Sequence, residues 1–510
     1  EAMNFKGKPT VILARTINGY GLGEAGEGRN ITHNQKKLNQ SELLYFRDRF
    51  NVPFSDDKAT EAPFYRFDKD SAEYKYLKEK RIALGGSMPI RTNRSTTLDI
   101  PEISIFQELL DGTDEREIST TMAYVRLLTL LTKDKSIGKH IVPIIPDEAR
   151  TFGMDPLFRQ LGIYAHKGQL YDPVDSDQFL YYKEVKNGQI LEEGINEAGA
   201  VSSFIAAGVS YSTHGIKMIP FYIYYSMFGF QRIWDFIWAA GDMRARGFLL
   251  GGTAGRTTLN GEGLQHQDGH SHLAAAATPN IKAYDLAYAY EIATVIHHGM
   301  KEMCQDDKDV IYYLTLENEN YAHPSMPDGI ADDIIKGLYK TRSTEKPIIR
   351  LFGSGPIIGE VVAAAELLKA DWGIEPGIWN VTSFSELRRN AEEVERWNLI
   401  NPDKEPRQSH LERCLSKHRV PTVAASDYVK MVSEQIGPYV PGPYYALGTD
   451  GFGRSDTREN LRHFFEVDRY YIVLTAIRAL ALDGKMDMSK VDDVMKKYNL
   501  DPEKPSPITV

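Results

Sequence analysis

The chain has 510 residues, of which 42% are hydrophobic and 11% aromatic, and this composition is typical of a well-packed globular protein. A single hydrophobic core rarely spans so many residues, so we expect about two to four domains. The net charge of −10, from 60 Lys and Arg against 70 Asp and Glu, argues against a general nucleic-acid surface.

The sequence shows no feature of a membrane or secreted protein. The apolar run Phe221–Phe230 is too short and too polar at its edges to cross a bilayer. Residues 1–10 have neither the charged region nor the apolar region of a secretory signal. The two cysteines, Cys304 and Cys414, are too few for a disulfide framework. We therefore expect a cytoplasmic protein that binds no membrane and no nucleic acid.

The first block of predicted elements runs to residue 97. Thr10–Ala14 is a continuous apolar run of the kind found in buried parallel strands. A loop with five glycines between residues 19 and 28 follows it, and then a polar, irregular stretch reaches Pro101. Because so little sequence precedes the predicted strand, we expect the chain to begin inside a domain.

The second block, residues 98–326, alternates predicted helices with predicted strands. This alternation predicts a mostly parallel α/β sheet. The predicted strands are Ile141–Ile145 and Met218–Tyr225, and the predicted helices are Ile118–Leu131, Ile195–Ala207 and Ala287–His298.

The third block, residues 327–510, predicts a second α/β domain. The turn from Gly353 to Gly359 superficially suggests dinucleotide binding, but its glycine spacing differs from that fingerprint and no acidic ribose partner follows the next strand. We interpret it as an ordinary strand-to-helix turn. The predicted elements are the strands Ile348–Phe352, Gly377–Thr382 and Thr422–Ala425, the helix Ile357–Leu368, and a helical tail from Leu474 onward.

Six segments together carry a resemblance to a known family. A glycine-rich loop or an aromatic run alone indicates little, but six segments that follow one another in the order of a single family are specific evidence. In that order the chain is similar, over most of its length, to the homodimeric pyruvate dehydrogenase decarboxylating component, a thiamine-diphosphate enzyme of the transketolase-like superfamily. The segments are Asn18–His33, Asp147–Gly153, Glu193–Gly199, Phe221–Phe230, Gly261–His272 and Leu447–Asp456.

The resemblance implies an α/β fold with transketolase-like, thiamine-diphosphate-binding parallel-sheet domains and a transketolase C-terminal-like α/β domain. On this basis, residues 1–97 end an N-terminal diphosphate-binding domain and carry the active-centre loop. Residues 98–326 form the pyrimidine-binding middle domain, and residues 327–510 form the C-terminal-like domain.

The implied activity is oxidative decarboxylation of pyruvate, followed by reductive acetylation of lipoyl groups on dihydrolipoyl acetyltransferase in the pyruvate dehydrogenase complex. The implied cofactors are thiamine diphosphate and Mg²⁺. The implied partners are pyruvate, a second copy of the chain in a homodimer, and the lipoyl domains of the acetyltransferase.

Glu197 is the residue to which the resemblance gives the most definite role. The aminopyrimidine of the cofactor reacts only when a carboxyl group hydrogen-bonds its ring nitrogen, and desolvation lets such a carboxyl hold a proton near neutral pH. The resemblance gives this role to Glu197, makes Ile195 the support of the bent cofactor, and stacks Tyr225 and Phe228 against the pyrimidine. From position alone, we would favour a helix N-terminal carboxylate for Glu197 and a core role in a buried strand for the aromatic residues.

Four further side chains are assigned to the substrate by the same resemblance. His33, on the glycine-rich loop, faces the bound intermediate, and His266 contacts the substrate side of the pocket, with Glu262 close by. Asp147 and Glu148, at the carboxyl end of a predicted strand, line the channel to the thiazolium. From position alone, this acidic pair equally caps a helix.

The histidines in Gly261–His272 also raise the question of a metal site, because His266, His270 and His272 have a spacing that can share an ion. No cysteine lies nearby, and Asp268 is the one acidic residue between the first and last of them. We therefore favour a substrate-binding histidine over a transition-metal site.

Two departures from the family pattern concern the diphosphate. Asn18 replaces a lysine that approaches the diphosphate, and since asparagine brings no charge, we expect weaker cofactor binding. The family's Gly-Asp-Gly…Asn motif for Mg²⁺ is not found, so no metal ligand is assigned here and the ligands are expected in preceding sequence. Two alternatives stay open: a transketolase-type sugar transferase, and an incomplete fragment that acts only in assembly.

Overall fold

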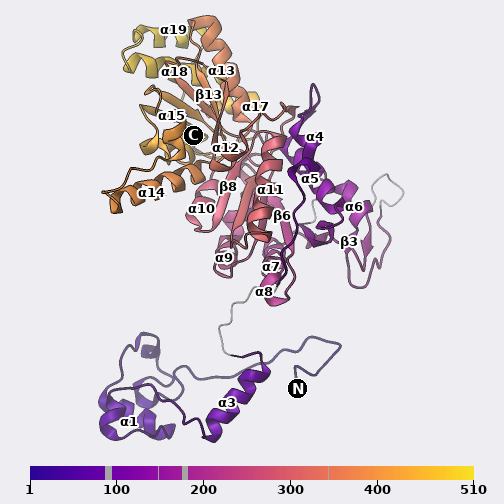
Figure 1. Cartoon of the computed structure of the whole chain (residues 1–510), viewed down its shortest axis with the longest axis vertical. Coiled ribbons are helices and arrows are strands. Elements are labelled where there is room, and N and C mark those ends of the chain that lie inside the picture. Colours follow the sequence, from indigo (N-terminus) through magenta and orange to yellow (C-terminus); the bar gives the residue numbers. More distant parts are fainter. Residues whose placement is uncertain (87–94, 147–148, 175–181, 343) are drawn as a thin grey trace. The chain divides into compact units, whose positions relative to one another are not determined.

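The computed structural model describes residues 1–86, 95–146, 149–174, 182–342 and 344–510. The chain forms two compact units, Glu1–Arg91 and Thr92–Val510, shown in Figure 1. None of the helices in the described residues has the length and apolar character that a membrane span requires.

The first unit consists of short helices joined by extended loops. The strand predicted over Thr10–Ala14 is wrong: this segment has no regular structure, and Val11, Ile12 and Leu13 are 80%, 75% and 93% exposed. An extended segment becomes a strand only when a neighbouring backbone pairs with it, and the described part of this unit contains no strand. Its elements are η1 (Gly23–Ala25), η2 (Asn30–Asn34), α1 (Gln40–Arg49), α2 (Asp56–Thr60) and α3 (Ala72–Ala83).

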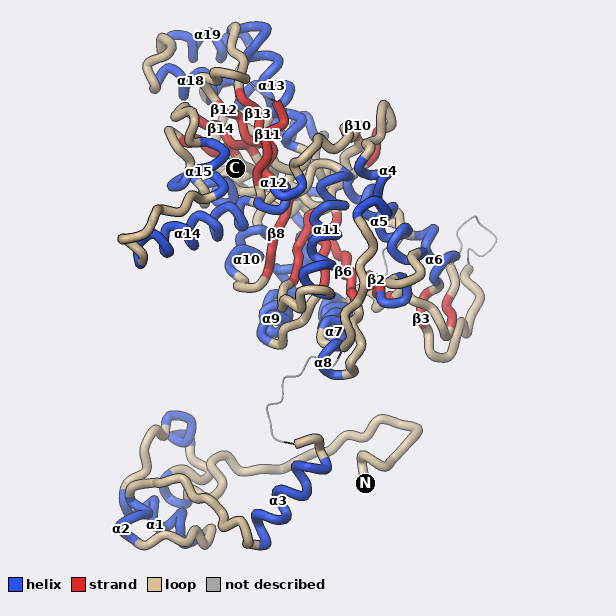
Figure 2. Tube along the Cα trace, viewed as in Figure 1, coloured by secondary structure: helices blue, strands red, loops and turns tan. Residues whose placement is uncertain are grey.

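A six-stranded, wholly parallel sheet forms the centre of the second unit. The prediction of a mostly parallel α/β sheet is confirmed by this pairing, and Figure 2 shows the strands of the sheet among helices. In pairing order the strands are β5 (Leu191–Glu192), β2 (Ile141–Ile145), β6 (Ile219–Tyr225), β7 (Gly247–Gly252), β9 (Ile311–Thr315) and β8 (Ile281–Asp285).

Both faces of this sheet are covered by helices, which explains the continuous apolar strands. Alternate side chains of β6 enter different cores: Phe221 and Ile223 pack with α5 and α11, whereas Tyr222 and Tyr224 pack with α7, α9 and α10. These helices are α5 (Thr120–Lys133), α11 (Ala289–Cys304), α7 (Glu197–Gly208), α9 (Gly229–Asp242) and α10 (Ser271–Ala277).

Smaller elements surround the six-stranded sheet. They are η3 (Ile103–Phe106), α4 (Gln107–Leu110), β1 (Glu117–Ile118), η4 (Gly138–His140), α6 (Asp155–Leu161), β3 (Ile163–Tyr164), β4 (Glu184–Val185), α8 (Ser210–Thr213), η5 (Ser226–Phe228), η6 (Gly263–Gln265), β10 (Tyr321–Ala322) and α12 (Ala331–Lys336).

A five-stranded sheet follows, with β11 antiparallel at one edge and the other strands parallel. In pairing order its strands are β11 (Leu338–Arg342), β13 (Gly377–Val381), β12 (Arg350–Gly353), β14 (Thr422–Ala425) and β15 (Tyr444–Leu447). One face packs on α13 (Ile357–Trp372), α17 (Arg458–Phe464), α18 (Arg469–Leu482) and α19 (Ser489–Lys497), and the other on α14 (Phe384–Ile400), α15 (His410–Leu415) and α16 (Lys430–Glu434). The short helix η7 (Gly437–Tyr439) precedes β15.

The two sheets meet through the loops at their carboxyl ends. Asp427, two residues beyond β14, is fully buried and accepts four hydrogen bonds. They come from the backbone N–H groups of Thr257 (2.9 Å) and Thr258 (2.8 Å) and from both hydroxyls (2.7 Å each). Since these threonines lie on the loop after β7, this carboxylate fastens that loop to the second sheet.

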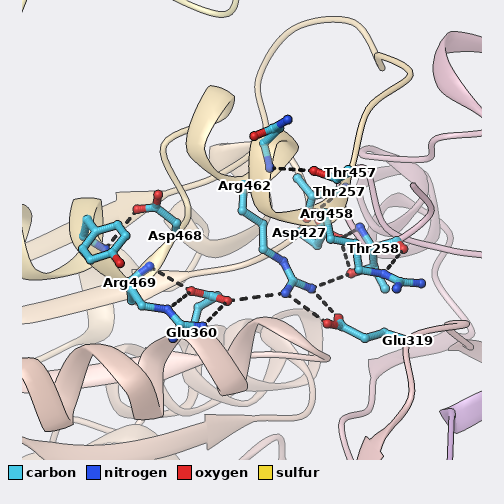
Figure 3. Close-up of polar contacts among 12 residues, drawn as sticks. Thr257, Thr258, Glu319, Glu360, Asp427, Thr457, Arg458, Arg462, Asp468 and Arg469 are labelled. Atoms are coloured by element: carbon cyan, nitrogen blue, oxygen red, sulfur yellow. Dashed lines mark hydrogen bonds and ion pairs between the residues drawn. The ribbon is translucent and has the colours of Figure 1, made fainter. Parts of the chain in front are cut away.

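A buried guanidinium reinforces the same contact, as Figure 3 shows. Arg462 of α17 is 6% exposed and forms ion pairs with Glu319, which follows β9, and with Glu360 of α13 (3.5 Å). Glu360 is also held by Arg469 (2.9 Å). The carboxylates around this guanidinium offset the cost of burying its charge.

We predict that Arg462→Met lowers the free energy of unfolding of the chain. Breaking a buried ion pair costs about 3–5 kcal/mol, and we expect about 3 kcal/mol because Arg469 still pairs with Glu360. Urea unfolding followed by circular dichroism measures the difference. The matched control is Arg478→Met on the exposed side of α18, expected within about 0.5 kcal/mol. Equal stability of the two variants would contradict the structural role given to Arg462.

Candidate functional site

An aromatic cluster lies at the carboxyl end of β6. Tyr225 is the last residue of the strand, and Phe228 follows in η5. Their ring centroids are 5.6 Å apart, and the ring of His266 lies 5.2 Å from each of them. Because carboxyl ends of parallel strands are where ligands bind in such sheets, this triangle of rings marks the candidate site.

Glu197 belongs to the same site through Arg232. It is the first residue of α7, which Asn196 caps by accepting a hydrogen bond from Gly199 N–H (3.1 Å). The Glu197 carboxylate, 13% exposed, pairs with the Arg232 guanidinium at 2.8 Å. That guanidinium lies 3.8 Å from the ring centroid of Phe228. The carboxyl therefore has a charged partner that stacks on Phe228, and Ile195, two residues before it, is 69% exposed.

The loop that carries His266 is fixed at both sides of this residue. The His266 ring nitrogen Nδ1 lies 3.3 Å from Glu262 Oε2. Gln267 donates to the carbonyl of Leu259 (2.6 Å) and accepts from Arg454 N–H (2.7 Å) of the second sheet's domain. Since the same loop begins at the threonines bound by Asp427, contacts with that domain position His266.

Asp268 anchors the histidine loop through hydrogen bonds. It is fully buried and accepts hydrogen bonds from Ser226 Oγ and from the N–H groups of His270 (2.9 Å) and Ser271 (3.0 Å). Burial raises the pKa of Asp268, but the charge of His270 and these hydrogen bonds outweigh it, so the pKa lies below its ordinary value. Asp268 is thus a structural carboxylate that ties the histidine loop to the end of β6.

The three histidines of this loop point into different surroundings. His272 is buried, its Nε2 lies 3.1 Å from Thr315 Oγ1, and burial lowers its pKa to about 4. The side chain of His270 is 43% exposed and contacts Asp268. Within the part of the chain that the structure describes, no group of three His, Cys, Asp or Glu side chains is arranged to hold a metal ion.

The other predicted residues belong to the first unit or fall outside the described residues. His33, in η2, and Asn18 are exposed residues of the first unit. The Asn18 carbonyl accepts a hydrogen bond from Gly28 N–H (2.8 Å), which closes the glycine-rich loop. Asp147 and Glu148 fall outside the described residues. The structure therefore brings together Glu197, Tyr225, Phe228 and His266.

Two contact residues of the site were missed in the sequence analysis. Arg232 lies four residues after Phe228, and this spacing places two side chains on one helical face, so it was a usable signal. Ser226, the donor to Asp268, lies within the aromatic run, and nothing in its sequence position distinguishes it from a core serine.

Two family models match this chain. The model described as pyruvate dehydrogenase E1 component middle domain matches residues 98–324, and that described as transketolase-like TK C-terminal domain matches residues 337–468. The pyruvate dehydrogenase E1 component of Cupriavidus necator is 55% identical over 514 aligned residues, covering 100% of this chain and 57% of that protein. The Escherichia coli K12 protein of the same name is 51% identical, covering 99% of this chain and 57% of its own length. The chain belongs to the pyruvate dehydrogenase E1 family.

Solved structures show the fold that the E1 family shares with transketolases. Transketolase from Leishmania mexicana aligns with a TM-score of 0.63 and 16% identity, covering 99% of this chain and 64% of that one. The Campylobacter jejuni enzyme gives a TM-score of 0.62 and 14% identity, with 92% and 63% covered. The transketolase-like α/β fold class is confirmed, and the divisions of the E1 chain at residues 97 and 326 stay predictions. The chain spans less than two thirds of the length of its E1 relatives.

Three buried carboxyls in this E1 chain were not expected from the sequence. Asp285 ends β8, Glu317 follows β9, and together with Asp427 they lie where the two sheets meet. Burial raises the pKa of Asp285 to about 6 and raises the pKa values of Glu317 and Asp427 above their ordinary range. Among the described residues, neither Asp285 Oδ2 nor Glu317 Oε2 has a hydrogen-bond partner.

Two glycines allow this approach of backbone to carboxylate. A Cβ atom on Gly355 would lie 2.8 Å from both carboxylate oxygens of Asp285. A Cβ atom on Gly255 would lie 2.7 Å from Glu317 Oε2 and closer still to Asp427 Oδ2. Both glycines also have positive φ angles, +50° and +85°, which other residues rarely adopt.

We predict that the free energy of unfolding of the Asp285→Asn variant, compared with that of the native chain, increases as the pH rises. An unfolded aspartate has a pKa of about 3.9, and the folded carboxyl has one of about 6, so the native chain takes up a proton on folding between these values. The stability that protonated Asp285 provides is complete below pH ~4 and lost above pH ~6, a change of about 3 kcal/mol. The variant, uncharged throughout, keeps it.

Urea unfolding of both proteins at pH 5 and pH 8 measures this linkage. The control, Asp328→Asn at an exposed position, should shift stability equally at the two pH values. A difference between native chain and Asp285→Asn that does not change with pH would exclude the raised pKa.

Proposed function

We propose that this chain forms part of a thiamine-diphosphate-dependent enzyme that decarboxylates pyruvate oxidatively and passes the acetyl group to lipoyl groups of dihydrolipoyl acetyltransferase. The 55% identity over the whole chain to a protein named pyruvate dehydrogenase E1 component carries this proposal. The grouping of Glu197 with Tyr225, Phe228 and His266 at one sheet edge supports it.

The grouped residues fit the pyrimidine half of thiamine diphosphate. Phe228 accepts a flat polar group on its face, since the planar Arg232 guanidinium stacks there at 3.8 Å. The mostly buried Glu197 carboxylate beside it accepts an N–H hydrogen bond in the same place. No group of side chains that could hold Mg²⁺ is found among the described residues, and we propose that the remaining length of the relatives supplies the ligands of Mg²⁺ and of the cofactor's diphosphate.

Each residue then has a task. When bound, thiamine diphosphate supplies an acidic carbon that adds to the keto group of pyruvate. Glu197 holds a proton at the pyrimidine ring nitrogen, and Tyr225 and Phe228 keep water from the reacting groups. His266, with Glu262 at 3.3 Å, serves the substrate. Ile195 supports the cofactor.

Three further assignments stay proposals without support from contacts in the structure. Asp147 and Glu148 line the channel, and Asn18 contributes one uncharged hydrogen bond near the diphosphate. His33 serves lipoyl transfer.

We also propose that the protein acts as a cytoplasmic homodimer in the pyruvate dehydrogenase complex, with lipoyl domains as partners. Trp234 and Trp238 are 40% and 51% exposed on α9, the helix that carries Arg232. Exposed aromatic groups of this kind support an interface beside the site.

The test uses a full-length protein in which this chain is joined to the preceding sequence of a relative. We expect it to decarboxylate pyruvate with an artificial electron acceptor and to be inactive with xylulose phosphate. Transfer from the sugar, in place of pyruvate decarboxylation, would instead establish a transketolase-type enzyme.

In that protein, we predict that Glu197→Gln lowers decarboxylation by about 10²–10⁴-fold, because an amide of the same size cannot exchange a proton with the ring. Steady-state rates at saturating cofactor measure the effect. Glu193→Gln, four residues earlier, is the matched control and should keep most of the rate. Near-normal activity of Glu197→Gln would remove this residue from cofactor activation.

His33→Ala should separate two steps that one activity assay mixes. Opening the lipoyl disulfide forms a carbon–sulfur bond and leaves a thiol, whose sulfur needs a proton that a histidine can deliver. Decarboxylation needs no such donor, so we predict that it is largely kept while acetyl transfer to lipoyl domains falls much further. Both rates are measured on one preparation. A drop by the same factor in both would show that His33 acts earlier or only through its loop.

A further inference from the structure

A basic cleft of about 490 Å³ lies on the C-terminal domain, at the amino ends of β12 and β13. Its size is that of a small-molecule site, about 300–1,000 Å³. This edge lies opposite the carboxyl ends that meet the six-stranded sheet, so the cleft is separate from the site around Glu197. The side chains that line it include Lys340, Lys346, Arg350, Trp379, Cys414 and Lys417.

Arg350 is the unusual residue of the cleft. It begins β12, is 2% exposed, and donates from Nη2 to the carbonyls of His418 and Pro441 (3.2 Å to the latter). Its Nη1 has no hydrogen-bond partner among the described residues, and none of their carboxylates pairs with it. Burial alone lowers its pKa to about 10. A buried guanidinium without an anion is costly, and a bound anion would remove that cost.

The other walls of the cleft also present donors. Trp379 Nε1 would lie 3.8 Å from a Cβ atom on Gly377, the first residue of β13, and no residue in the described part of the chain accepts a hydrogen bond from it. Lys340 holds its ammonium 5.7 Å from the Trp379 ring centroid. Lys346 and Lys417 are exposed and, within the described residues, form no ion pair.

The charge balance of the lining selects an anion. Among its described residues, four side chains are cationic and Glu345 is the one carboxylate, although the whole chain has a net charge of −10. A phosphate group has only acceptor oxygens, and guanidinium, ammonium and indole N–H groups are only donors, so the two sets are complementary.

We propose that this cleft binds a small molecule that carries a phosphate group, with Arg350 at its base and Lys346 and Lys417 at its rim. The carboxyl edge of the same sheet, where ligands bind in open α/β sheets, is filled by the contact with the six-stranded sheet. The amino edge is therefore the accessible end of this domain.

Pyrophosphate is the probe, and isothermal titration calorimetry on the 510-residue chain is the measurement. We expect saturable binding that Lys346→Glu and Lys417→Glu each weaken by ~10-fold or more, the loss expected for one charge-assisted hydrogen bond. Arg350 is left unchanged because its removal would disturb β12. Lys133→Glu, an exposed position on α5 with the same change of charge, should stay within ~2-fold of the native chain.

A second readout reports the place of binding. Cys414 lines the cleft and is partly exposed, whereas Cys304 is buried. Burial raises the pKa of Cys414 to about 11, so thiol labelling is run at alkaline pH. Bound pyrophosphate should slow labelling of Cys414 in the native chain and have no such effect in Lys417→Glu.

Two outcomes would overturn the proposal. The first is the absence of saturable pyrophosphate binding, or binding that the cleft variants leave unchanged. The second is citrate binding as tightly as pyrophosphate, which would make the cleft a general anion site. Both outcomes are independent of thiamine diphosphate and of pyruvate turnover, so they do not bear on the proposed enzyme activity.

Discussion

The four hydrogen bonds accepted by the buried Asp427 carboxylate join the two sheets of the second unit. They fix Thr257 and Thr258, and the loop that these threonines begin carries His266 to the rings of Tyr225 and Phe228. The candidate site lies on the six-stranded sheet, yet one of its walls is positioned from the C-terminal domain. A domain that contributes no residue to the aromatic cluster thereby determines its geometry.

Burial on both faces leaves continuous apolar runs, and from these runs the sequence predicts several of the buried strands. Ile141–Ile145 and Thr422–Ala425 agree with the structure to the residue. The strands β7, β8 and β9 of the six-stranded sheet were missed. Three of the six residues of β7 are glycines and carry no apolar signal, whereas β8 and β9 have apolar residues that the sequence analysis did not identify as strands. Thr10–Ala14 has the same apolar signal as the true strands, but no strand pairs with it in the described part of its unit, and pairing cannot be seen in one local segment.

For the candidate site, the resemblance selected the residues and the structure supplied their contacts. Glu197 and Phe228 are 31 positions apart in sequence, and only the parallel sheet, with Arg232 between them, brings them together. The buried carboxyls Asp285 and Glu317 could not be predicted, because their surroundings come from both sheets at once. Local sequence specifies a carboxylate, whereas its burial is decided by segments far away in the chain.

The glycines that face these carboxylates have a consequence for how the protein evolves. Any side chain at Gly355 would displace Asp285, and any side chain at Gly255 would displace both Glu317 and Asp427. Mutations at these positions in one domain can be accepted only together with compensating changes in the other. We therefore expect the two domains to evolve together. A chimera that takes one domain from a distant homologue should fold poorly unless these glycines and carboxylates are exchanged together.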